Sequence, residues 1–122
     1  MVRSPANRPF HNLATIRELA EEGKIKFGNH SASRDAKTLD LDKVAVRKFI
    51  LCLRSDHFFK RYPKQKCFDG REQLDCDAYK MSFDGKLLCE NSTTGDLIFA
   101  KLGIHQQRDG KNIAIVSFHL DR

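Results

Sequence analysis

Apolar residues in the first half of the chain recur with the period of an α-helix. Asn12 can cap a helix that continues through Leu13, Ile16 and Leu19 and ends at Gly23. The sequence therefore predicts a first amphipathic helix that buries one apolar stripe.

A longer stripe follows near the middle of the chain. Val46, Phe49, Ile50 and Leu53 occupy positions i, i+3, i+4 and i+7, which places them on one face of a helix. Asp40 or Asp42 can cap this helix. We expect the stripe to supply much of the core.

Shorter elements complete the first half. We expect a short strand at residues 24–27, a helix capped by Ser31 that ends near Thr38, and one further helical turn at residues 55–60. Phe58 and Phe59 would anchor that last turn.

The second half changes to the two-residue period of β-strands. Residues 73–83, 97–104 and 112–120 predict three strands, and Asp84-Gly85 and Asp109-Gly110 supply turn chemistry. Helices followed by strands predict an α+β fold, in which the N-terminal helices pack on one face of a small antiparallel sheet. We expect a flexible leader at residues 1–9 and a single domain at residues 10–122.

Alternation assigns the strand side chains to two faces of the sheet. One face is apolar and should pack on the helices; its members are Tyr79, Met81, Phe83, Ile98, Ala100, Leu102, Ile104, Ala114, Val116, Phe118 and Leu120. The opposite face collects polar and aromatic groups, namely Lys80, Phe99, Lys101, Ser117 and His119. Ile113 and Ile115 fall on this second face by the same alternation.

Positive charge is concentrated in the first 72 residues. The chain has 22 Lys and Arg against 16 Asp and Glu, for a net charge of +6. Clustered cations suit a polyanion because phosphate binding releases condensed counterions, and an aromatic ring among cations can stack a nucleobase. An ordinary solvent-exposed face, or a contact for an acidic protein, is the alternative interpretation.

The cysteines and the hydropathy pattern argue against a metal-binding protein and against a membrane protein. The spacing of Cys52, Cys67, Cys76 and Cys89 contains no C-x-x-C pair, so we expect no metal site and no cofactor. A Cys/His site drawing on Cys67, Cys76 or His57 is the alternative. No apolar run has the length of a membrane span and no secretory signal is visible, so we expect a cytoplasmic protein without a membrane partner.

An ordered set of segments resembles the MqsR toxins, which are relatives of the RelE-type ribonucleases. The segments are PFHNL at 9–13, EGK at 22–24, LRSDHFFK at 53–60, DAYK at 77–80, GDLIFAKL at 95–102 and IVSFH at 115–119. The corresponding MqsR segments include D-F-Y-K, W-Q-D-V-Y-R-P, V-Y-L-K and I-V-S-F-K. The resemblance covers residues 9 to 120.

The resemblance implies a type II toxin, a bacterial endoribonuclease that cuts mRNA and is neutralised by a cognate antitoxin protein. Lys60 falls on the lysine of D-F-Y-K, and Lys101 on the lysine of V-Y-L-K. Several positions depart from the family pattern. Cys76 replaces a glutamine, Phe99 a tyrosine and His119 the closing lysine. Asp75 stands in place of the tryptophan, and Lys80 and Met81 in place of the arginine and proline.

From these residues we expect a metal-independent reaction in which the RNA 2′-hydroxyl attacks the neighbouring phosphate. His119 would transfer a proton, Lys101 would stabilise the phosphorane, and Lys60 would bind the phosphate or transfer the second proton. The expected RNA-binding residues are Arg61, Lys64, Cys76, Lys80 and Phe99. Three other functions stay open: a non-catalytic nucleic-acid- or partner-binding module on the same fold, a ribosome-dependent nuclease and a zinc protein.

Overall fold

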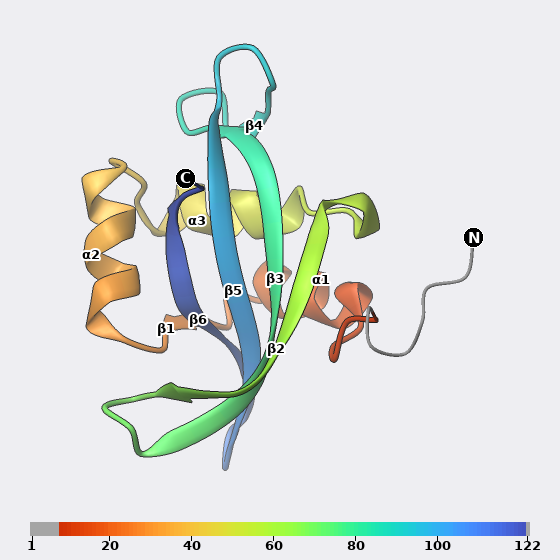
Figure 1. Cartoon of the computed structure of the whole chain (residues 1–122), viewed down its shortest axis with the longest axis vertical. Helices are drawn as coiled ribbons and strands as arrows, with labels where there is room; N and C mark the ends of the chain where they lie inside the picture. Colours follow the sequence, from red (N-terminus) through yellow and green to blue (C-terminus); the bar gives the residue numbers. More distant parts are fainter. Residues whose placement is uncertain (1–7, 122) are drawn as a thin grey trace.

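The computed structural model describes residues 8–121, so the leader predicted at residues 1–9 lies almost entirely outside the described part. In chain order the elements are α1 (Leu13–Glu21), β1 (Ile25–Phe27), α2 (His30–Thr38), α3 (Lys43–Leu51), the 3-10 turn η2 (Ser55–His57), β2 (Phe58–Cys67), β3 (Glu72–Asp84), β4 (Cys89–Glu90), β5 (Asp96–Gln107) and β6 (Gly110–Leu120). The predicted α+β class is confirmed (Figure 1).

The helices begin where short polar side chains accept hydrogen bonds from free backbone N–H groups. Asn12 accepts from the N–H of Ala14, and Asp42 accepts from the N–H of Ala45. The cap of α2 is Asn29 and not the predicted Ser31, because the Asn29 side chain accepts from the N–H of Ala32.

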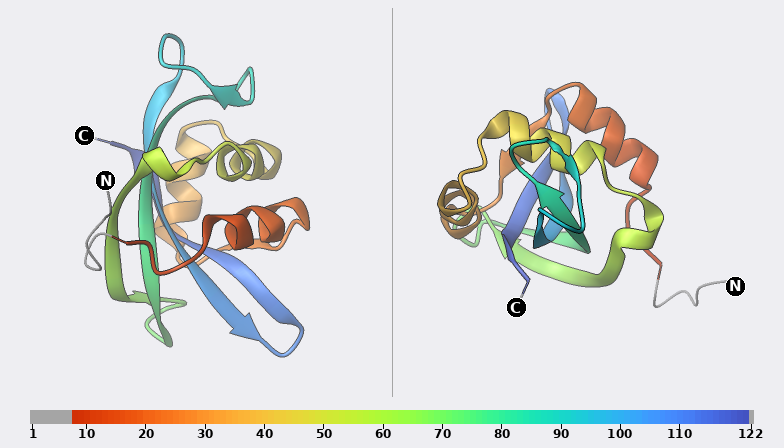
Figure 2. Two further views of the ribbon diagram at one scale, coloured as in Figure 1. Left: turned by 90° about the vertical axis from the view of Figure 1, so that its right-hand side faces the viewer. Right: turned by 90° about the horizontal axis from the view of Figure 1, so that it is seen from above.

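The strands form one mixed sheet in the order β1-β6-β5-β3-β2, and β4 pairs with β3. The contacts among β2, β3, β5 and β6 are antiparallel as predicted, whereas β1 pairs parallel with β6. Figure 2 shows α1 and α3 on one side of this sheet. The side that neither of them covers is the helix-free face, and α2 packs against β6 at its edge.

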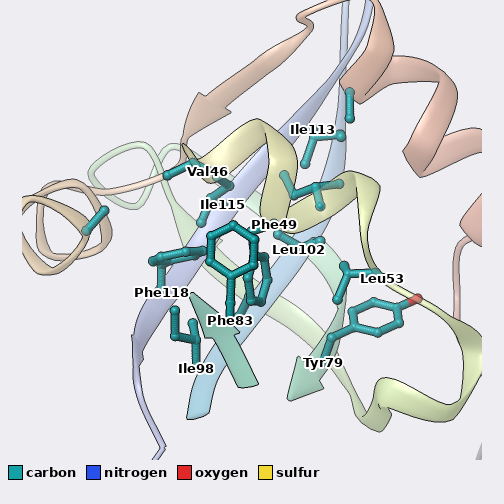
Figure 3. Packing of buried hydrophobic residues seen from close by; sticks show 14 of the residues in the cluster. Val46, Phe49, Leu53, Tyr79, Phe83, Ile98, Leu102, Ile113, Ile115 and Phe118 are labelled. Atoms are coloured by element: carbon teal, nitrogen blue, oxygen red, sulfur yellow. The ribbon is translucent and has the colours of Figure 1, made fainter. Parts of the chain in front are cut away.

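The main core lies between the sheet and the helices. All four residues of the predicted α3 stripe, Val46, Phe49, Ile50 and Leu53, are buried. The Phe49 ring meets Phe83 and Phe118 edge-on, at centroid distances of 5.5 and 5.1 Å (Figure 3). The apolar strand face therefore packs on the helices as predicted along β3, β5 and the end of β6.

One bulge changes the face assignment along β6. Lys101 pairs with Ser117 but Leu102 pairs with Ile115, so Val116 is an extra residue without a partner across the ladder. Ile113 and Ile115 consequently join Phe118 in the main core. The prediction that placed these two isoleucines beside His119 is wrong, because strict alternation cannot anticipate a bulge.

The segment at residues 55–60 also differs from the prediction. Only Ser55–His57 form a helical turn, and the chain then enters the ten-residue strand β2. The far end of the β2–β3 hairpin curves beneath β6, where the N–H of Phe68 donates to the carbonyl of Gly28 at 2.6 Å (Figure 1). The tip of the β2–β3 hairpin therefore covers one end of the helix-free face, and the opposite end of this face stays uncovered.

Candidate functional site

Strand register places the predicted side chains in two adjacent rows on the helix-free face. Residues paired across a ladder point to the same side of a sheet. The first row runs through Lys80, Phe99 and His119. The second runs through Lys60, Ala78, Lys101 and Ser117.

An open groove of about 710 Å³ lies over these rows. Its walls come from β2, β3, β5, β6 and the α2 helix; the lining side chains are Asp35, Phe59, Tyr62, Lys80, Phe99, Lys101, Ser117, His119, Leu120 and Asp121. Four of the eight predicted site residues line this groove, and the other four do not.

The predicted residues that line the groove are Lys80, Phe99, Lys101 and His119. All four come from strands whose alternation the sequence showed. Phe59, Tyr62 and Gln65 lie on β2, which the sequence analysis took in part for a helical turn, and they were missed for that reason.

Phe99 forms the floor of the groove and is only 9% exposed. The His119 imidazole stacks on it at 5.1 Å with an interplanar angle of 15°. Phe59 and Tyr62 each present an edge to it, both at 6.3 Å. These neighbours cover the Phe99 ring, so the aromatic groups above it are more accessible from the groove than Phe99 itself.

Phe59 is the most exposed aromatic side chain of the groove, with 49% of its surface accessible. It stands at a bulge of β2, since Phe58 pairs with Tyr79 and Lys60 pairs with the adjacent Ala78. The extra residue turns Phe59 into the groove while Phe58 packs on Tyr79 in the core.

His119 is exposed, and one of its ring nitrogens is already engaged. Its Nδ1 lies 2.8 Å from the carbonyl oxygen of Leu120. A carbonyl can only accept, so this contact places the proton on Nδ1 and leaves the Nε2 lone pair free to accept a proton.

Lys101 is a half-buried cation without a carboxylate partner within ion-pair distance among residues 8–121. Burial lowers the pKa of its ammonium group. Its Nζ donates to the Gln65 Oε1 at 2.8 Å and lies 4.5 Å from the centre of the Tyr62 ring. The remaining N–H donors of this group are therefore available to an anion in the groove.

Lys80 is held differently, although it lines the same groove. Its Nζ lies 3.2 Å from a carboxylate oxygen of Asp121 and 3.8 Å from the centre of the Phe59 ring. Its charge is thus partly compensated inside the protein.

Lys60, Arg61 and Lys64 do not line the groove. Lys60 is exposed, and its Nζ lies 5.3 Å from the Tyr62 ring that Lys101 also contacts, so it stands at the margin. Arg61 shares a row with Asp77, and its guanidinium covers the Phe10 ring at 4.8 Å.

The Arg61 row continues into the main core, so this side chain belongs to the helix-covered side of the sheet. Lys64 is exposed at a second bulge of β2. The structure thus separates Arg61 and Lys64 from the groove that they were predicted to extend.

Cys76 is completely buried. It packs with Cys67 and Val116 in a small second core beneath the curved hairpin. Burial raises the pKa of its thiol to about 12, so the group is neutral and inaccessible. The predicted contact between Cys76 and RNA is corrected accordingly.

His57, which was an alternative candidate, is a structural residue. Its Nδ1 accepts the backbone N–H of Arg54, and its Nε2 lies 2.7 Å from a carboxylate oxygen of Glu90. This buried imidazole therefore connects η2 to β4, away from the groove residues.

No protein-family model and no curated protein matches the sequence. The resemblance to MqsR toxins therefore rests on the sequence motifs described above.

Two further features of the described residues bear on partners. Across residues 8–121, none of the helices combines the length and the apolar character that crossing a bilayer requires. The same part of the chain contains no group of three or more His, Cys, Asp or Glu side chains arranged to hold a metal ion.

Proposed function

We propose that this protein is an endoribonuclease of the toxin type that cuts mRNA without a metal ion. The observation that carries the proposal is the groove itself, in which the His119 imidazole and the Lys101 ammonium share one open sheet face with the Phe59 and Tyr62 rings. Cations suit phosphates and aromatic rings suit unstacked bases, which is the chemistry of single-stranded RNA recognition.

The proposed reaction uses the nucleophile that RNA itself carries. The 2′-hydroxyl oxygen bonds to the adjacent phosphorus as its proton passes to the His119 Nε2, and the bond from phosphorus to the 5′-oxygen breaks. A protonated group, for which Lys60 at the groove margin is our candidate, supplies the proton for the leaving oxygen. Lys101 stabilises the negative charge on the phosphorane.

The products are a 2′,3′-cyclic phosphate and a 5′-hydroxyl, so atoms and protons balance without a co-reactant. The resemblance to MqsR toxins also implies a cognate antitoxin protein. In the proposal this partner inhibits the nuclease activity of the groove.

The proposal is tested by incubating the purified protein with a mixed-sequence RNA in EDTA and identifying the ends of the fragments. We expect cleavage with cyclic phosphate ends and no cleavage of the 2′-deoxy analogue. General acid–base catalysis contributes about 10²-fold or more, so His119→Ala should slow cleavage by about 100-fold.

His30→Ala is the matched control, because His30 is an exposed histidine on α2 that does not line the groove. Equal rates in the two variants would remove His119 from the mechanism. Binding of RNA that weakens with salt, without fragments even when ribosomes are added, would instead identify a binding module on the same groove.

A further inference from the structure

A bulge in β2 brings two side chains to the Lys101 ammonium that regular alternation would keep apart. Tyr62 pairs with Cys76 and Gln65 pairs with Leu74, so three steps along β2 match two steps along β3. Residues i and i+3 of a regular strand point to opposite faces, and one extra residue puts them on the same face.

The bulge is held in place by its own contacts. Lys64 has a positive φ of 51°, a conformation that non-glycine residues rarely adopt, and its N–H donates to the Asp75 carboxylate at 3.0 Å. The Gln65 amide is fixed in turn, because its Nε2 donates to the Pro63 carbonyl at 3.0 Å. This second bond orients the amide so that its oxygen is presented to Lys101.

Among residues 8–121, Gln65 is the only side chain whose oxygen accepts a hydrogen bond from the Lys101 ammonium, at 2.8 Å. An amide oxygen stabilises the ammonium by its dipole but brings no negative charge that would neutralise it. A carboxylate at the same place would form an ion pair, as Asp121 does with Lys80.

We propose that Gln65 is a positioning residue for the proposed nuclease reaction: it orients the Lys101 ammonium beside Tyr62 and keeps it charged yet uncompensated for the phosphate. This inference rests on the proposed function, since it assigns the task of Lys101 to the same groove. It also assigns a function to the β2 bulge, which aims the amide at its lysine.

Two substitutions at Gln65 separate positioning from a merely structural role. Gln65→Leu removes the acceptor, and we expect kcat to fall about tenfold with little change in KM, as for the loss of one hydrogen bond to a charged group. Gln65→Glu adds a charge that favours the protonated lysine.

Lys101 must stay protonated to stabilise the phosphorane, as Lys60 must to donate its proton, so the high-pH limb of the rate profile includes the loss of the Lys101 proton. We expect this limb to move to lower pH in Gln65→Leu and to higher pH in Gln65→Glu. Gln73→Leu is the matched control, because Gln73 is an exposed glutamine of the same hairpin that does not line the groove.

A measurement that needs no activity accompanies the kinetics. The pH titration of the Lys101 side-chain signals in NMR, assigned with Lys101→Met, should shift in the same two directions in the Gln65 variants. Titration midpoints and rate limbs that stay at the wild-type positions in both variants would overturn the inference.

Failure of the nuclease proposal would look different. If the wild type cuts no RNA, a 2′-O-methyl oligonucleotide takes the place of the substrate. Its addition should then perturb the Lys101 signals in the wild type and less so in Gln65→Leu, whereas equal perturbation would show that Gln65 does not position the lysine.

Discussion

At the residue scale, the two lysines that line the groove carry the same formal charge in different settings. Lys80 is paired with Asp121, whereas Lys101 has only the amide of Gln65 and an aromatic ring beside it. An arriving phosphate must compete with a carboxylate for Lys80 but not for Lys101. The field in the groove is therefore strongest around Lys101.

This difference predicts that Asp121 weakens RNA binding. Asp121→Asn removes a negative charge from the groove and frees Lys80, so we expect RNA affinity to rise severalfold at low salt and the gain to shrink as salt is added. Fluorescence anisotropy with a labelled 2′-O-methyl oligonucleotide measures this affinity at each salt concentration.

Asp109→Asn is the control, because it makes the same charge change at an exposed position of the β5–β6 turn. The same gain in both variants would mean that net charge alone matters and that the pairing of Lys80 does not.

At the element scale, the sequence predicted those elements that have one apolar side and one polar side. The α3 stripe and the alternation of β3 and β5 were predicted because one side of each packs on the main core. β2 has no such separation: its side chains are divided among the core, the groove and solvent, and two bulges break its period.

The candidate site was predictable to the same extent. Lys80, Phe99, Lys101 and His119 come from β3, β5 and the end of β6 beyond its bulge, where alternation held, and they share the groove. Cys76 lies on the same face of β3 as Lys80 but is covered by the curved hairpin, a tertiary effect that no local pattern contains. Charge alone could not show that Arg61 points to the other side of the sheet.

The packing of β5 against β3 leaves little room for a side chain at Gly103. A Cβ at this position would lie 3.0 Å from the Cys76 Sγ and 3.2 Å from the Leu74 Cβ. We expect Gly103→Ala to lower the free energy of unfolding by about 1–3 kcal/mol, as overpacking of a tight interior does.

Denaturant titration measures this effect, and a second variant tests its cause. Cys76→Ala in the Gly103→Ala background removes the sulfur and should recover part of the loss, so the two changes should be non-additive. Additive effects would place the strain elsewhere.

At the scale of the whole molecule, ionic contacts connect the chain around the open end of the sheet. Glu90 on β4 accepts hydrogen bonds from Arg54 and His57, which precede β2. These bonds, first from Arg54 and then from His57, lower the pKa of the Glu90 carboxyl in the folded protein.

This contact predicts a loss of stability in acid. A depressed carboxyl pKa stabilises the fold above the pKa of the unfolded chain, near 4.5, and the contribution disappears as the pH falls through the lower folded value. Glu90 is about one third exposed, so we expect Glu90→Gln to cost only about 1 kcal/mol at pH 7.

Thermal unfolding of wild type and Glu90→Gln from pH 7 to pH 3 tests this, because the difference between them should close toward the acid end. A difference that is constant across the range would mean that Glu90 acts through packing and not through its charge.

The parallel pairing of β1 with β6 has a consequence for how the protein matures on the ribosome. β1 emerges early, but its ladder partner among the described residues is β6, the last strand of the sheet to be synthesised, and that strand also carries Ser117 and His119. A nascent chain that lacks β6 thus has neither a docked first strand nor an assembled groove. Under the proposed function, cleavage of any message, including the one from which the protein is being made, would have to wait until β6 has been translated.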